Sequence, residues 1–213
     1  MSDHFALKVG GLHTIDDDLP SFRPTHLLGI FDPAMPEPPA YARHAGEHER
    51  LLLRFRDSEA AVDNGPLAQH VETMLAWIDR ALARDNGSPG GRLFIHCHAG
   101  ASRSTATAYL TLIRRHGIAA AEAAFAELLR LTRKPWPNRA LVQFADDILD
   151  ARGRLLQPLD AYRRAHPLRL EAYIRLHTIR ARRDPAYGDK LGVAQWRPPR
   201  RRPHSAPEKV QPG

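Results

Sequence analysis

The 213-residue sequence contains a single cysteine, which excludes an internal disulfide and the disulfide-dense classes of secreted protein. It also lacks any run of about eighteen apolar residues, so we expect no membrane span. The first residues, MSDHFALKVGG, lack the basic and apolar regions of a signal peptide. These absences predict a cytoplasmic protein, and its length suffices to bury one hydrophobic core.

Charge is distributed unevenly along the chain. Residues 1–150 have a net charge of −3, whereas residues 151–213 contain 15 Lys and Arg against 5 Asp and Glu, a net charge of +10. The basic character therefore belongs to the C-terminal part, which is typical either of a solvated tail or of a segment with an anionic partner.

Four short apolar runs are bounded by Gly, Pro and Asp, which is the pattern of short strands. Between and after them, apolar residues recur at spacings of three and four, which is typical of amphipathic helices. This alternation predicts an α/β fold with a mainly parallel central sheet flanked by helices. The expected strands are Phe5–Val9, His26–Phe31, Leu51–Phe55 and Arg92–His96.

Four helices are expected to accompany these strands. The first carries Leu67 on its apolar face and is capped by Asp63 or Asn64, and the third carries Leu129 on its inward face. The second begins near Arg103, the third spans roughly 119–131, and the fourth begins at Asn138.

The C-terminal part is expected to be organised differently. Beyond a compact domain of residues 1–150, a basic helical extension is predicted over residues 151–183, with helices at 155–165 and 167–183. Residues 184–213 are rich in proline and arginine and show no apolar periodicity, so we expect an extended or disordered tail there.

One segment, FIHCHAGASRST at residues 94–105, carries most of the chemical information. It places Cys97 directly after an apolar strand, follows it with small residues, and places Arg103 six positions later at the start of a helix. A helix N-terminus has unpaired N–H groups and a positive dipole end, which suit a phosphate group. Gly100 can adopt a positive φ, and Arg103 can contact two phosphate oxygens at once. The same positive field favours the thiolate form of Cys97.

This segment resembles the signature of the protein tyrosine phosphatase superfamily, in which His-Cys is followed by five residues, an arginine, and Ser or Thr. The wider chain looks most like the dual-specificity group, in a bacterial-type form, over roughly residues 5–150. The resemblance implies that Cys97 attacks phosphorus, Arg103 stabilises the transition state, and Ser104 assists the departure of the thiolate. It implies no metal or cofactor for the loop, and His96 as a supporting rather than a catalytic residue. The residues expected to bind phosphate are His98, Ala99, Gly100, Ala101, Ser102 and Arg103.

The resemblance also implies an aspartate that protonates the leaving oxygen, on a loop upstream of the cysteine. Asp57 lies two positions beyond the end of one predicted strand and Cys97 directly follows another, so both are expected at the same edge of the sheet. Asp63 is the alternative, although a role as a helix cap explains it equally well. Asn138 either caps the fourth helix or positions a water molecule or substrate near the pocket.

The sequence thus predicts phosphomonoester hydrolysis on phosphotyrosine or on mixed phosphorylated side chains. Three alternatives remain open. One is a pseudophosphatase that binds phosphate without turnover, and another is the same chemistry on a non-protein phosphate such as a phosphoinositide. The third gives the basic tail the main role, as a module that binds nucleic acid or a membrane surface. The partners expected are a phosphorylated protein or a small phosphate substrate and, for the basic segment, an anionic molecule.

Overall fold

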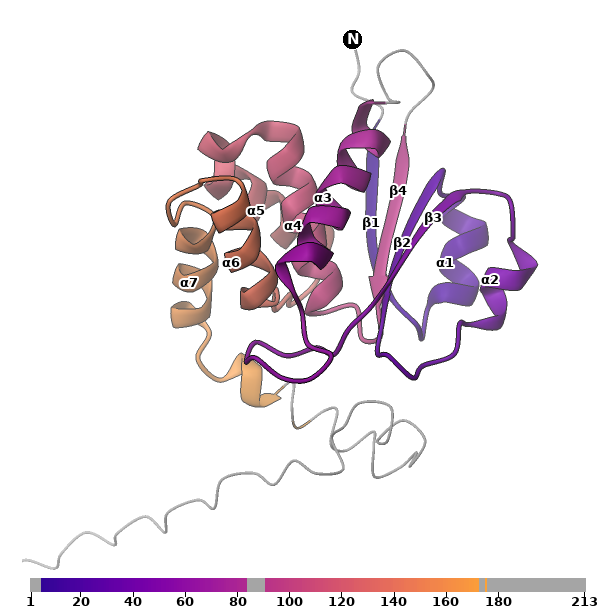
Figure 1. Cartoon of the computed structure of the whole chain (residues 1–213), viewed down its shortest axis with the longest axis horizontal. Coiled ribbons are helices and arrows are strands. Elements are labelled where there is room, and N and C mark those ends of the chain that lie inside the picture. Colours follow the sequence, from indigo (N-terminus) through magenta and orange to yellow (C-terminus); the bar gives the residue numbers. More distant parts are fainter. Residues whose placement is uncertain (1–4, 84–90, 173–174, 176–213) are drawn as a thin grey trace, which may run out of the picture. The chain divides into compact units, whose positions relative to one another are not determined.

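Four parallel strands form the central sheet, in the order β1-β4-β2-β3 (Figure 1). The computed structural model describes residues 5–83, 91–172 and 175, and the described residues up to 172 belong to one compact unit. The strands are β1 (Ala6–Gly11), β2 (His26–Phe31), β3 (Glu49–Arg54) and β4 (Arg92–Cys97). The predicted α/β fold with a parallel central sheet is therefore confirmed.

Helices cover both faces of the sheet (Figure 1). One face packs against the short helices α1 (Ile15–Phe22) and α2 (Pro39–Arg43), which the sequence analysis did not predict. On the other side lie the longer helices and one 3₁₀ turn; the first two helices and the one after the turn contact the strands, and the others pack against helices. In chain order, the elements on this side are α3 (Ala68–Ala83), α4 (Arg103–His116), η1 (Ile118–Ala120), α5 (Ala121–Leu131), α6 (Arg139–Ile148) and α7 (Leu156–Ala165).

The alternation of side chains along the strands divides the core into two clusters. In β4, Leu93, Ile95 and Cys97 face the cluster that contains α3 and α4, whereas Phe94 faces the cluster that contains α1 and α2. Every residue of β2 is buried, as expected for an interior strand covered on both faces. Cys97 therefore lies at the end of a strand that the core holds rigidly.

The start of α3 differs from the prediction. The helix begins at Ala68, so neither Asp63 nor Asn64 caps it. Instead the Asn64 carbonyl accepts a hydrogen bond from the Arg56 amide at 2.7 Å, which closes a loop between β3 and the helix. Leu67 precedes the helix and is 57% exposed. Its place on the apolar face was wrong, because spacing alone does not show where the helix begins.

The predicted start of α4 at Arg103 and its stop at Gly117 agree with the structure. Phe125 and Leu128 of α5 are buried as expected, but Leu129 is 41% exposed, so its inward placement was wrong. It lies one position beyond the stripe of α5 that faces the core.

Helix α7 packs into the same hydrophobic core as the sheet, through Leu156, Leu159 and Tyr162. Most of the helix expected over 167–183, and all of the tail expected over 184–213, lie outside the described residues. The domain boundaries at 150 and 183 therefore stay predictions. No helix among the described residues combines the length and apolar character needed to cross a membrane.

Candidate active site

The loop between β4 and α4 consists of the residues that were expected to bind phosphate. Its peptide carbonyls are held by backbone N–H groups of neighbouring segments. In a trans peptide the next residue's N–H points opposite to the carbonyl, so the amides of Ala99, Ser102 and Arg103 face away from these neighbours. The His98 carbonyl accepts a hydrogen bond from the Leu12 amide at 3.0 Å. The Ala101 carbonyl accepts one from the Trp136 amide at 2.8 Å. The Ser102 carbonyl accepts one from the Asn138 amide at 3.3 Å.

Gly100 makes the turn of this loop possible. Its φ is +72°, and a Cβ there would lie 2.7 Å from the backbone carbon and oxygen of Gly10 at the end of β1. Both the backbone conformation and the close approach to another strand therefore require glycine.

Gly100→Ala is expected to lower both the thermal stability and the kcat/KM for an aryl phosphate. Gly117→Ala is the matched control, because Gly117 has a φ of +86° with nothing within 4 Å of its Cβ position. The Gly117 variant measures backbone strain alone, about 1–3 kcal/mol. Gly100→Ala adds the collision with Gly10 to its own backbone strain. Thermal denaturation and steady-state rates check this. Equal losses in the two variants would show that the contact with β1 does not shape the loop.

Cys97 ends β4 with a side chain that is 1% exposed. Its Sγ lies 3.2 Å from the Oγ of Ser104, in the first turn of α4. A hydroxyl at this distance can donate a hydrogen bond to a thiolate. The distance between Cys97 and Ser104 therefore allows the hydrogen bond that the resemblance implies.

Arg103 is buried at the start of α4, and its guanidinium contacts two other loops. Nη1 donates to the Phe55 carbonyl at 2.6 Å and to the Asp32 carboxylate at 3.0 Å. Nε lies 3.6 Å from Oδ2 of Asp57 and has no hydrogen-bond partner in the described part of the chain. The hydrogen bonds of the guanidinium that involve other described loops are thus both made by Nη1, while Nε stays unpaired beside Asp57.

Asp57 is held against the same loop. Its Oδ1 accepts hydrogen bonds from Ser102 Oγ at 2.7 Å and from Asn138 Nδ2 at 2.9 Å. Asn138 Nδ2 also donates to the Ser58 carbonyl at 3.2 Å, and its Oδ1 accepts from the Leu141 amide as the cap of α6. Asn138 therefore caps α6, and its side-chain amide also contacts Asp57. That it positions a water molecule or substrate stays a prediction.

Asp63 lies apart from this arrangement. It is exposed on the loop before α3, and no hydrogen bond or ion pair among the described residues joins it to the loop after Cys97. The geometry therefore brings Asp57, not Asp63, together with Arg103.

His96 lies on the opposite face of β4 from Cys97 and is fully buried. It forms a hydrogen bond through Nε2 with the hydroxyl of Tyr41 in α2, and its Nδ1 lies 3.5 Å from the Cys97 carbonyl. Burial lowers the pKa of His96 to about 4, so the ring is neutral at neutral pH. Gly29 leaves the space for this pair, since a Cβ there would meet the Tyr41 hydroxyl. A neutral ring that faces the backbone fits the supporting role expected for His96.

Two residues near the site were not predicted from the sequence. Asp32 directly follows β2, and the strand-end rule that selected Asp57 could have found it. Tyr41 carried no signal, because it reaches His96 from a helix 55 positions away in the chain.

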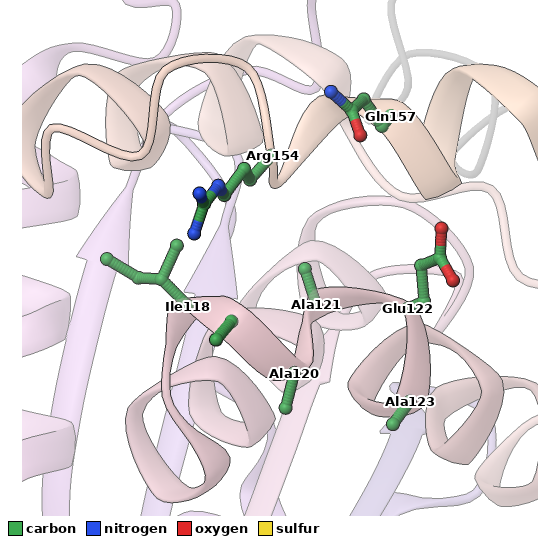
Figure 2. Close-up of a pocket in the computed structure, with 8 residues that line it drawn as sticks. Ile118, Ala120, Ala121, Glu122, Ala123, Arg154 and Gln157 are labelled. Atoms are coloured by element: carbon green, nitrogen blue, oxygen red, sulfur yellow. The ribbon is translucent and has the colours of Figure 1, made fainter.

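A separate cavity of about 450 Å³ opens beside η1 and the start of α5 (Figure 2). Arg154 extends toward Ile118 at its rim, and Glu122 and Gln157 also line it. None of the residues around Cys97 lines this cavity, so the candidate site does not extend to it.

No protein-family model matches the chain, and no curated protein matches its sequence. Solved structures do match. The structure of DUSP15 is 18% identical with a TM-score of 0.51, and the match covers 75% of this chain and 94% of that one. A human tyrosine phosphatase-like serine/threonine/tyrosine-interacting protein is 19% identical with a TM-score of 0.50, over 68% and 91% of the two chains. The chain therefore has the fold of the dual-specificity and tyrosine phosphatases.

Proposed function

We propose that the chain hydrolyses phosphomonoesters through a cysteinyl-phosphate intermediate, with phosphotyrosine or mixed phosphorylated side chains of proteins as substrates. One observation carries this proposal: Cys97, Arg103 and Asp57, from three segments of the chain, meet around one loop whose turn requires Gly100. The fold alone does not decide the matter, because one of its matches is described only as phosphatase-like.

In the first step, the Cys97 thiolate attacks phosphorus while the bond from phosphorus to the leaving oxygen breaks. Negative charge on the transferring group is shared among its three equatorial oxygens. The amides of the loop and the free N–H groups of Arg103 stabilise that charge, and their positions are fixed before the reaction begins.

Asp57 supplies the proton that the leaving oxygen needs. In the second step it accepts a proton from the attacking water, the bond between sulfur and phosphorus breaks, and Ser104 donates to the departing thiolate. The bonds from Ser102 and Asn138 are donated to Asp57 and suit its ionised form, which is the state between the two steps.

The variable positions of the loop favour substrates with a single phosphate group. These positions hold His98, Ala99, Gly100, Ala101 and Ser102, with no lysine to bind additional phosphates. A panel of phosphopeptides and phosphoinositides tests this choice, and we expect the peptides to be hydrolysed faster.

Asp57→Asn is expected to lower kcat/KM, which reports the first step, about 10²-fold for phenyl phosphate and much less for an aryl phosphate with a strongly activated leaving group. An activated phenolate departs without a proton, whereas an unactivated one does not. Steady-state kinetics with both substrates measure the difference.

Asp63→Asn is the matched control, because it removes a carboxylate from the same connection six residues later. It should leave both rates within a few-fold of wild type. If Asp63→Asn instead shows a loss that depends on the leaving group, Asp63 is the general acid. If neither variant shows such a loss, no general acid lies on this loop and the assignment is contradicted.

A further inference from the structure

Two described carboxylates, Asp32 and Asp57, lie within 4 Å of the Arg103 guanidinium. The proposed reaction gives a role to Asp57 but none to Asp32. It directly follows β2, the strand that pairs with β4, and therefore lies at the edge of the sheet where Cys97 ends its own strand. Its side chain is 16% exposed and accepts a hydrogen bond from Nη1 of the buried Arg103 at 3.0 Å.

The contacts of Arg103 differ between its nitrogens. Nη1 is occupied by Asp32 and by the Phe55 carbonyl, whereas Nε is buried without a hydrogen-bond partner in the described structure. A planar guanidinium held at one nitrogen cannot rotate without breaking both contacts. The two acceptors thus determine which edge of Arg103 is presented to an anion.

Burial of the Asp32 carboxylate is unfavourable for the fold, and its contact with Arg103 offsets only part of that cost. The pKa of Asp32 is raised because its burial outweighs the attraction of Arg103, and the nearby charge of Asp57 adds to the effect, while Arg56 opposes it. A carboxyl whose pKa is raised by folding makes the folded state less stable once the pH exceeds its unfolded pKa. At neutral pH the ionised Asp32 is therefore a cost to the fold, which is typical of a functional group.

We propose that Asp32 is a positioning residue, which fixes the Arg103 guanidinium so that its free edge faces the transferring phosphoryl group. Asp32 acts through Arg103 and does not itself touch the substrate. This inference rests on the proposed function, since it assigns Asp32 to the same reaction.

The test compares Asp32→Ala and Asp32→Asn with the control Glu37→Gln. Glu37 belongs to the same connection between β2 and α2, is half-exposed, and lies 3.8 Å from Arg54 rather than beside Arg103. Alanine removes both the charge and the acceptor oxygen, asparagine keeps an oxygen that can accept from Nη1, and the control removes a charge alone.

We expect Asp32→Ala to lower kcat by up to about 10²-fold with KM within a few-fold, and Asp32→Asn to lose less. Vanadate, which adopts the five-coordinate geometry of the transition state, should lose more affinity for Asp32→Ala than inorganic phosphate does. The melting temperature of Asp32→Asn at neutral pH should equal or exceed that of wild type. Glu37→Gln should change none of these quantities.

Two results would overturn the proposal. One is an unchanged kcat and an unchanged vanadate affinity in Asp32→Ala. The other is a fall in melting temperature in both Asp32 variants with equal losses of phosphate and vanadate affinity, which a merely structural role predicts. A wild-type protein without hydrolytic activity would contradict the proposed function instead, and the oxyanion affinities of the variants would still decide the role of Asp32.

Discussion

Cys97→Ser is expected to reduce the hydrolysis of p-nitrophenyl phosphate by at least about 10⁴-fold while it leaves the binding of inorganic phosphate close to that of wild type. A serine hydroxyl is not ionised at neutral pH, and His96 cannot act as the base that would activate it. His96 is on the other face of β4, and its neutral ring faces the backbone carbonyl of residue 97. The loop amides and Arg103 remain in the variant, so the anion still binds.

Two measurements check this expectation: the steady-state rate, and the affinity for phosphate from calorimetric titration. Ser104→Ala serves as the comparison, since it removes the neighbouring hydroxyl 3.2 Å away but keeps the nucleophile. Its first step should remain fast, so a burst of phenolate should precede a slower steady state. Turnover by Cys97→Ser at a rate close to that of wild type would show that Cys97 is not the nucleophile.

Arg103→Lys is expected to lower kcat about 10³-fold, although the positive charge is retained. A lysine ammonium has no planar fork, so it cannot satisfy Phe55 and Asp32 and at the same time contact two phosphate oxygens. The buried Asp32 carboxylate would also lose its hydrogen bond, so we expect a lower melting temperature as well.

Arg114→Lys is the matched control for this change. Arg114 lies in the last turn of the same helix and donates two hydrogen bonds to the Asp79 carboxylate, at 2.6 and 2.8 Å. This pair is exposed and lies at the opposite end of the helix from the loop. Exposed pairs of this kind contribute about 0–1 kcal/mol, so its kcat should match that of wild type. An Arg103→Lys variant as active as the control would contradict the two-point contact on which the proposal depends.

The parts of the site that the sequence predicts are those that lie close together in the chain. Cys97, Arg103 and Ser104 belong to one strand, loop and helix, so their spacing alone fixes their approximate geometry. Asp57 could be predicted from the rule that the ends of parallel strands share an edge. The same rule applies to Asp32, which directly follows β2 and was not predicted.

Other features could not be predicted from local pattern. The pairing of Tyr41 with His96 depends on how α2 packs against the sheet and on the missing side chain of Gly29. The residue range of α3 depends on the hydrogen bond between Arg56 and Asn64, which keeps the preceding loop out of the helix. Leu67 consequently lies outside the helix although its spacing matches the apolar stripe. In each case contacts between distant segments, rather than local preference, decide the structure.

A mass measurement of the protein after rapid acid quenching during turnover tests the central proposal most directly. With phenyl phosphate or p-nitrophenyl phosphate and the Ser104→Ala variant, whose second step should be slowed, the account predicts a fraction of chains heavier by one phosphoryl group. Peptide mapping should place that group on Cys97, the only cysteine in the sequence. Turnover with no phosphorylated chain at any quench time, or with the group on another residue, would contradict a cysteinyl-phosphate intermediate.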